Sequence, residues 1–305
     1  LDITEEDREA MVAVVKAKPD QGHRLHLAQA KGSPEEPADP SAPKYYVATN
    51  LSEGASVSLL VTGVPGTMVN RLSFEKAFTA TVDKRHLAVF DQIKDDGKPL
   101  WGEFTFKLTA EGVEPLELKG KFLGAKGGAY QNRLKAFKES VQAEYDKEIA
   151  ELREYITTLK NLQVEASKLI LEYKRDWTTP GSRSKINNEW TTFTKNSQNL
   201  LSQLDANLKA RQSPEKQAKY NARSFQDVST TLAQLEQLVK VQGERLSGTA
   251  PSSNPDDLDG LLQAGVQALE AWLAQAVSKS PFDQVSPSGA NGAKAPPAPA
   301  PAPNA

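Results

Sequence analysis

The residues of this sequence that are best suited to chemistry are two adjacent aspartates in the segment DDGKPLWGEFTFKL, residues 95–108. Asp95 and Asp96 offer carboxylate oxygens, the ligands that calcium prefers. A calcium loop needs further oxygen ligands at regular spacing, and no such acidic series follows here. Gly97 instead favours a hairpin turn with positive φ, and Pro99 keeps the next residues extended. We therefore interpret the segment as a turn that leads into a strand.

The three histidines of the chain are the other candidates for metal binding. His23 and His26 form an H-x-x-H pair, but on a strand this spacing directs the two rings to opposite faces. A zinc site would also need a third ligand, and the sequence has no H-E-x-x-H. His86 stands at the start of an expected strand, where it is as compatible with a surface position as with a functional one. We predict no metal ligands and no bound cofactor.

The sequence also lacks the common catalytic motifs. It has no G-x-S-x-G, no G-x-G-x-x-G after a strand and no phosphate-binding loop. The glycines of GAKGG, within residues 124–130, join a strand region to a helical region and are better interpreted as a hinge. A carboxylate pair for glycoside hydrolysis would need two acids at a defined separation, but spacing singles out none of the 39 acidic residues. We predict no catalytic residues.

Two of the four tryptophans are expected to lie at one end of a helical hairpin. If the chain folds back at residues 183–184, Trp177 comes to lie opposite Trp190. Arg183 and Lys185 lie around them. We favour an aromatic plug that closes the end of a helical bundle. A docking tip for a protein partner or an anionic surface is the functional alternative.

The region that carries Asp95 and Asp96 has the pattern of short strands. After a short helix within residues 1–22, the β-branched and aromatic content of residues 23–124 predicts an antiparallel sandwich or small barrel, with a proline-rich loop at 31–43. We favour a small antiparallel β-sandwich module. Alternation places Phe104, Phe106 and Leu108 on one face of a strand. The run PLWGEFTFKL is similar to the late hairpin of many bacterial immunoglobulin-like modules, and this resemblance over residues 99–108 implies an immunoglobulin-like sandwich.

Beyond the glycine hinge at residues 125–129, the apolar spacing changes to that of helices. Residues at intervals of four and three predict an elongated antiparallel helical bundle, or coiled-coil hairpin, over 130–279. Gln163 and Gln242 interrupt the apolar stripes, where polar residues set helix register. The expected helices are 130–177, 185–211, 214–246 and 255–279, followed by a disordered proline- and alanine-rich tail at 280–305.

Bulk properties narrow the class of protein. Apolar residues make up 38% of the 305, enough for a core, and the net charge of −2 argues against a protein that coats nucleic acid. Cysteine is absent, and no apolar run is long enough to span a membrane. Because the chain starts with Leu1 and not Met, we expect that an upstream segment was removed, and a cleaved signal peptide or a trimmed lipid anchor would leave such a start. We expect an extracytoplasmic bacterial protein.

The predicted architecture is therefore α+β, and the predicted function is non-enzymatic. We expect a structural or adaptor subunit of a bacterial cell-envelope or surface assembly, which binds a protein partner or oligomerises through its helices. The alternative is a module that binds a glycan or peptide through Tyr45, Tyr46 and Trp101. A secreted enzyme or toxin is the third hypothesis.

Overall fold

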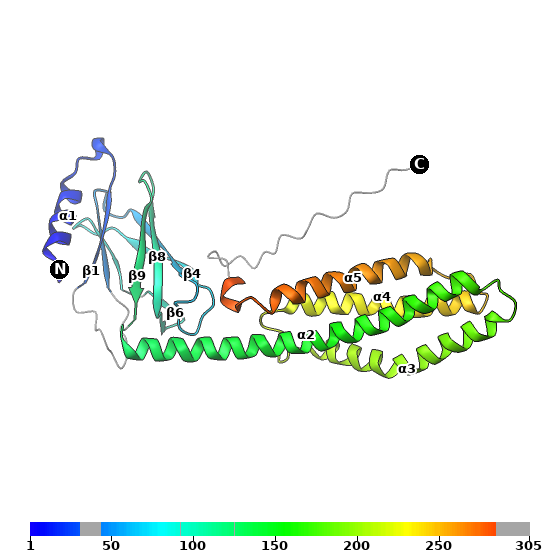
Figure 1. Cartoon of the computed structure of the whole chain (residues 1–305). Coiled ribbons are helices and arrows are strands. Elements are labelled where there is room, and N and C mark those ends of the chain that lie inside the picture. Colours follow the sequence, from blue (N-terminus) through cyan, green and yellow to red (C-terminus); the bar gives the residue numbers. More distant parts are fainter. Residues whose placement is uncertain (31–43, 92, 125, 285–305) are drawn as a thin grey trace. The chain divides into compact units, whose positions relative to one another are not determined.

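The computed structural model describes residues 1–30, 44–91, 93–124 and 126–284 (Figure 1). The described residues are 53% helical and 19% strand, with a sheet-rich N-terminal region followed by helices. The predicted α+β class is confirmed at this level. The expected proline-rich loop at 31–43 and nearly all of the expected tail lie outside the described residues.

The chain divides into two compact units. A sheet unit comprises Leu1–Ser140 and the segment that begins at Phe282, and a helical unit comprises Val141–Pro281. The division falls inside helix α2 (Gly128–Asp176), not at the predicted glycine hinge 125–129. The first turns of α2 therefore belong to the sheet unit.

The sheet unit contains two antiparallel sheets that share one apolar core. The first has the order β1-β2-β5, and the second has the order β4-β3-β8-β9. Their bounds are β1 Leu25–Gln29, β2 Tyr45–Thr49, β3 Ser56–Gly63, β4 Glu75–Thr81, β5 Leu87–Phe90, β8 Gly102–Ala110 and β9 Leu116–Leu123. A short hairpin, β6 (Lys94–Asp95) and β7 (Lys98–Pro99), precedes β8.

Alternation along the strands builds this core. On β8, Phe104, Phe106 and Leu108 are fully buried, as their spacing predicts. Leu108 pairs with Leu59 and Phe106 pairs with Val61 on the neighbouring β3, so large apolar side chains lie next to one another on one face. The described strands form open sheets and not a closed barrel.

Gly102 allows a close backbone approach at the start of β8. Its φ of 135° is unfavourable for other residues, and a Cβ there would lie 2.6 Å from the carbonyl oxygen of Thr67. Thr67 in turn accepts a hydrogen bond from the Glu103 N–H at 3.1 Å through its hydroxyl. This contact fixes the position of Trp101, the residue before the strand.

A short helix, α1 (Glu5–Lys16), covers the outer face of the three-stranded sheet (Figure 1). The Thr4 hydroxyl accepts the N–H of Asp7 as an N-cap, and Met11 packs in a small cluster with Ala28 and Ala48. Asp7 also lies 3.0 Å from the Nε2 atom of His26 on β1. A polar contact thus accompanies the apolar one between helix and sheet.

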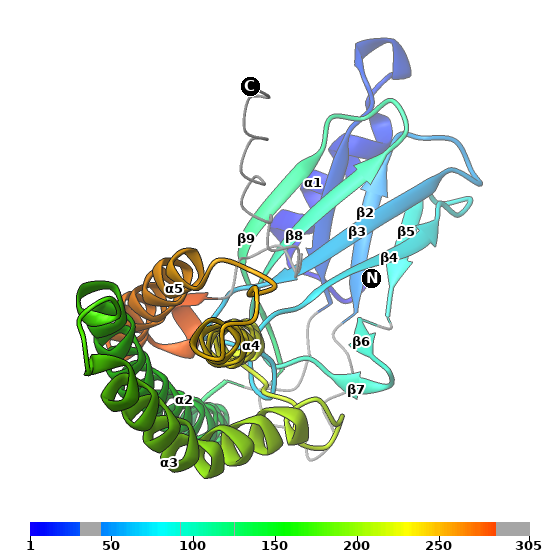
Figure 2. The ribbon, with the colours of Figure 1, turned by 90° about the vertical axis from the view of Figure 1, so that its right-hand side faces the viewer.

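The helical unit contains most of α2, with α3 (Ser182–Ala210), α4 (Ala222–Leu246) and α5 (Pro255–Ala276). Figure 2 looks roughly along these helices, with α4 between α3 and α5. All four contribute to one core, which includes Leu159, Phe193, Leu235 and Val266. No described helix combines the length and the apolar character needed to cross a bilayer.

Helix α4 begins at Ala222, whereas the sequence predicted a start at residue 214. Ser213 does not cap this helix, because its hydroxyl donates to the carbonyl of Ala210 at 3.0 Å and so closes α3. By contrast, Asn254 accepts the N–H of Asp256 at 3.0 Å and starts α5 as predicted. The connection between α3 and α4 is therefore longer than the sequence indicates.

Candidate functional site

The sheet unit contains a cavity of about 410 Å³ beside the predicted acidic turn. Three segments form it: the β3–β4 connection, the β6–β7 hairpin with the residues that follow it, and the first turns of α2. Its polar and charged lining residues are Asn70, Arg71, Asp95, Asp96, Lys98 and Arg133. Trp101 forms part of its wall.

The acidic turn is a hairpin turn, as its sequence predicts. Lys94 pairs with Pro99 and Asp95 pairs with Lys98, while Asp96 and Gly97 have φ values of 48° and 76°. Two consecutive positive φ values are typical of a type I′ turn, for which Asp-Gly is a favoured pair. The turn places Asp95 and Lys98 at the edge of the cavity.

Trp101 is largely buried, with 7% of its surface exposed. It packs with Val69 on one side and Tyr130 of α2 on the other, and the Tyr130 hydroxyl donates to the Thr67 carbonyl at 2.7 Å. The guanidinium of Arg133 lies over the indole, 4.5 Å from the ring centroid. Trp101 therefore connects the start of α2 to the sheet and presents little free surface to a partner.

The charges around the cavity do not balance. Asp95 forms ion pairs with Arg71 and, at 3.7 Å, with Lys76. The hydrogen bond from Arg71 holds the pKa of Asp95 below its ordinary value, so this carboxylate is charged near neutral pH. Within the described residues, neither Lys98 nor Arg133 forms an ion pair.

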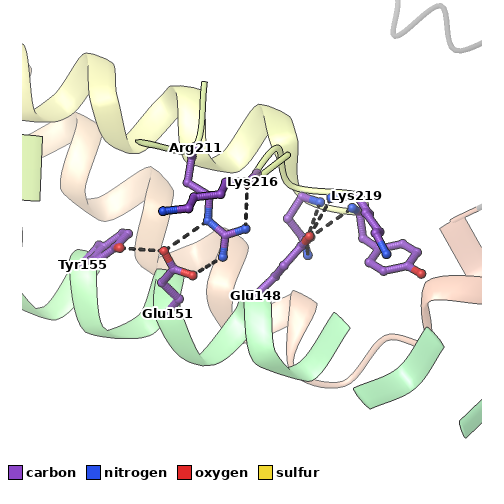
Figure 3. A network of polar contacts seen from close by, with 8 residues as sticks. Glu148, Glu151, Tyr155, Arg211, Lys216 and Lys219 are labelled. Carbon is purple, nitrogen blue, oxygen red and sulfur yellow. Dashed lines mark hydrogen bonds and ion pairs between the residues drawn. The ribbon is translucent and has the colours of Figure 1, made fainter. Parts of the chain in front are cut away.

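A second concentration of polar residues joins α2 to the α3–α4 connection (Figure 3). Glu148 is 6% exposed, and its carboxylate accepts the backbone N–H groups of Lys219, Tyr220 and Asn221 at 2.6, 3.2 and 2.9 Å. The Asn221 side-chain amide donates a fourth bond at 3.0 Å. One carboxylate thus satisfies three consecutive backbone N–H groups of the connection that leads into α4.

Glu151 holds the other end of the same connection. Arg211 forms a two-pronged ion pair with it and also donates to the Lys216 carbonyl at 3.0 Å, while the Tyr155 hydroxyl donates to Glu151 at 2.6 Å. Burial alone would raise the pKa of Glu151, but the bonds from Arg211 and Tyr155 hold it below its ordinary value. Sequence reasoning missed this network, and the only available signal was the acidic pair itself, one turn apart on the helix.

Of the residues predicted at the α2–α3 turn, Arg183 and Trp177 contact one another, while Lys185 and Trp190 contact other residues of the helical unit. Arg183 lies 5.2 Å from the Trp177 ring centroid and donates to the Trp177 carbonyl at 3.1 Å. Lys185 forms an ion pair with Glu172 at 2.7 Å. Trp190 is 5% exposed and packs on Phe193 in the bundle core, while Trp177 is half-buried against Tyr173. The two indoles thus belong to separate aromatic pairs.

The tyrosines predicted as ligand contacts are not both accessible. Tyr45 is fully buried and lies edge-on to Phe106, so it cannot meet a glycan or peptide at the surface. Burial also raises the pKa of its hydroxyl. Tyr46 is half-buried next to the α1 cluster, with Lys44 over its ring at 5.5 Å. The structure therefore separates Tyr45, Tyr46 and Trp101 and does not combine them into one binding face.

Across the part of the chain that the structure describes, no three histidine or acidic side chains converge as a metal-ligand set. No known protein family, curated protein or solved structure matches the chain.

Proposed function

We propose that this protein is a non-enzymatic structural or adaptor subunit of a bacterial cell-envelope or surface assembly. One observation supports the proposal most strongly. All four long helices pack apolar side chains into a single internal core. Ion pairs such as Lys160–Glu270 and Lys185–Glu172 then connect neighbouring helices. Such a unit is a rigid spacer with a polar surface, which suits a protein that holds partners at fixed positions.

We further propose that the sheet unit is an immunoglobulin-like sandwich. If its seven long strands are lettered A to G along the chain, its sheets have the orders A-B-E and D-C-F-G. Immunoglobulin constant-type domains have A-B-E-D and C-F-G, so the two arrangements differ only in the sheet that strand D joins. Sandwiches of this kind commonly serve as interaction modules, which supports the adaptor proposal by analogy.

The helical unit is proposed to contain coiled-coil packing and to mediate association between copies. Its α2 stripe keeps the intervals of four and three that coiled coils use. Val164 and Leu171 lie one heptad apart on α2 and are 54% and 63% exposed. An exposed apolar pair on an otherwise polar face supports a contact with another chain.

An extracytoplasmic location remains part of the proposal. The absence of cysteine from all 305 residues is compatible with an oxidising compartment. Fractionation of the source cells, with detection of the native chain, tests this location independently of any partner.

The adaptor proposal can be tested by site-directed photo-crosslinking in the source cells. A crosslinking residue at exposed Lys119 on β9 and another at Leu171 on α2 should each capture protein, and an adaptor should give different adducts at the two positions. A matched position at buried Leu235 should capture nothing outside the chain. Absence of adducts at both exposed positions would overturn the proposal.

The association proposal is tested by light scattering on the purified full chain. Val164→Glu with Leu171→Glu should convert an oligomer to a monomer that keeps its helical circular dichroism spectrum, because both side chains are exposed in the single chain. A wild-type chain that is already monomeric at high concentration would contradict this part of the proposal.

A ligand-binding module is the second candidate function, and the cavity beside Trp101 favours it. Its volume of about 410 Å³ falls in the range of small-molecule sites. The contacts differ from those expected for a glycan, because Trp101 presents little open ring face.

A further inference from the structure

The cavity of the sheet unit carries cations that the protein itself does not neutralise. Arg71, Lys98 and Arg133 line it together with Asp95 and Asp96, and Arg71 is paired with Asp95. The remaining carboxylate, Asp96, forms no ion pair within the described residues. The lining therefore has three cations, Arg71, Lys98 and Arg133, and two anions, which leaves a net positive charge of one.

Arg133 is held in a position from which it can donate. Its guanidinium lies over the Trp101 indole, 4.5 Å from the ring centroid, in a cation–π contact that holds the group beside the ring. A guanidinium carries five N–H donors, and a contact with an aromatic ring does not use them as hydrogen bonds to an acceptor atom. In the described part of the chain these N–H groups meet no protein acceptor, so an oxyanion ligand can accept from them.

From this geometry we propose that the cavity binds a carboxylate group, which Arg133 and Lys98 hold. Arginine donates two parallel hydrogen bonds to a carboxylate, and lysine adds a point charge. The inference goes beyond the adaptor proposal and does not depend on it. The carboxylate can belong to an acidic residue of a partner polypeptide or to a free small acid, and the experiment below separates these sources.

Two features favour a carboxylate over other ligands. A sugar ring would stack on an open aromatic face, whereas Trp101 is 7% exposed and Arg133 covers its indole. A phosphate group carries more negative charge than a carboxylate, and Asp96 in the lining opposes the extra charge more strongly. A monoanion suits a site whose positive excess is modest.

The test is isothermal titration calorimetry on the full chain with N-acetylglutamate amide, a hexapeptide with one glutamate and blocked termini, inorganic phosphate and N-acetylglutamine amide. We expect N-acetylglutamate amide or the peptide to bind, and phosphate and the neutral amide to bind at least about tenfold more weakly. Tighter binding of the peptide assigns the carboxylate to a polypeptide, and equal binding assigns it to a free acid. Failure of both acids to bind, or equal binding of phosphate or the amide, would overturn the proposal.

Variants that should change the carboxylate affinity in opposite directions distinguish an effect on binding from an effect on folding. Arg133→Gln and Lys98→Gln should each weaken carboxylate binding by about tenfold, because each removes a charge-assisted bond from an exposed side chain. Asp96→Asn should strengthen it severalfold, because asparagine tolerates the positive φ and removes the repelling charge. Lys119→Gln, on the edge strand β9 outside the cavity, is the matched control and should change nothing. Equal affinities for all four variants would contradict the assignment.

Discussion

At the scale of single residues, Glu148 shows how one side chain can hold a connection that is distant in the sequence. Its carboxylate accepts four N–H groups from Lys219, Tyr220 and Asn221, residues more than seventy positions away in the sequence. Hydrogen bonds to a charged acceptor are stronger than neutral ones, and a buried donor that loses its acceptor is costly. The connection before α4 therefore depends on a residue of α2.

We expect Glu148→Gln to lower the free energy of unfolding of the helical unit by about 2 kcal/mol. The amide keeps one acceptor oxygen but loses the charge and turns a donor toward other donors. Urea titration followed by circular dichroism measures the change. Glu154→Gln, an exposed change on the same helix, should shift stability by less than about 0.5 kcal/mol. Equal effects of the two variants would argue against the role of Glu148 in holding the connection.

Glu151 predicts how the same connection responds to acid. Because its pKa is lowered in the folded protein, the stability it contributes is present above its ordinary pKa of 4.5 and is lost as pH falls through the lowered value. The difference in unfolding free energy between wild type and Glu151→Gln should therefore be constant near neutral pH and shrink below about pH 4.5. When Glu151→Gln is made in a chain that also carries Arg211→Gln, the difference in unfolding free energy should depend less on pH. If its dependence on pH is the same as in the wild-type background, the ion pair is not the cause.

At the scale of elements, α4 and α5 approach one another closely at Gly265. A Cβ at this position would lie 3.1 Å from the Gln234 Oε1 atom and 3.3 Å from the Thr231 Oγ1 atom. A small residue thus sets the separation of the two helices. A Cβ on Gly260, about one and a half turns earlier on α5, would have no atom within 4 Å.

We expect Gly265→Leu to destabilise the helical unit by about 2 kcal/mol, because a large side chain must force the two helices apart. Gly260→Ala should stabilise it by about 1 kcal/mol, since alanine is the better helix former and meets no neighbour there. Thermal denaturation of both variants measures the contrast. Stabilisation by Gly265→Leu would mean that the α4–α5 contact is looser than described.

The elements show which parts of the fold the sequence predicts well. Strand alternation at Phe104, Phe106 and Leu108 and the Asp-Gly turn are local signals, and both are confirmed. The start of α4 was wrong because Ser213 and Pro214 resemble a cap locally, while Glu148 acts from a distant helix. Local pattern cannot reveal a hydrogen bond across such a separation.

The candidate site was predicted only in part, for the same reason. The segment 95–108 was singled out, but Arg71 and Arg133 come from elements that the sequence gives no reason to place beside it. Tyr45 was selected as an aromatic contact, yet its register on β2 directs it into the core. Which face of a strand is buried depends on the neighbouring sheet.

At the scale of the whole molecule, the two compact units have separate cores. We expect two thermal transitions by calorimetry, because units with their own cores unfold as separate cooperative bodies. Phe106→Ala should lower only one transition and Leu235→Ala only the other, each by about 3 kcal/mol of unfolding free energy. A single transition that both variants shift equally would contradict independent unfolding.

Helix α2 has a consequence for how such a protein can change over evolution. Because its first turns carry Tyr130 and Arg133 of the sheet unit, a recombination break within residues 125–129 would separate the two sheets from residues that pack against Trp101. A donor gene would have to supply the sequence through Ser140 for the transferred module to keep its cavity. The glycine-rich segment is therefore a poor point of exchange, although the sequence suggests it as the boundary, and a break after Ser140 would keep the first turns of α2 with the sheets.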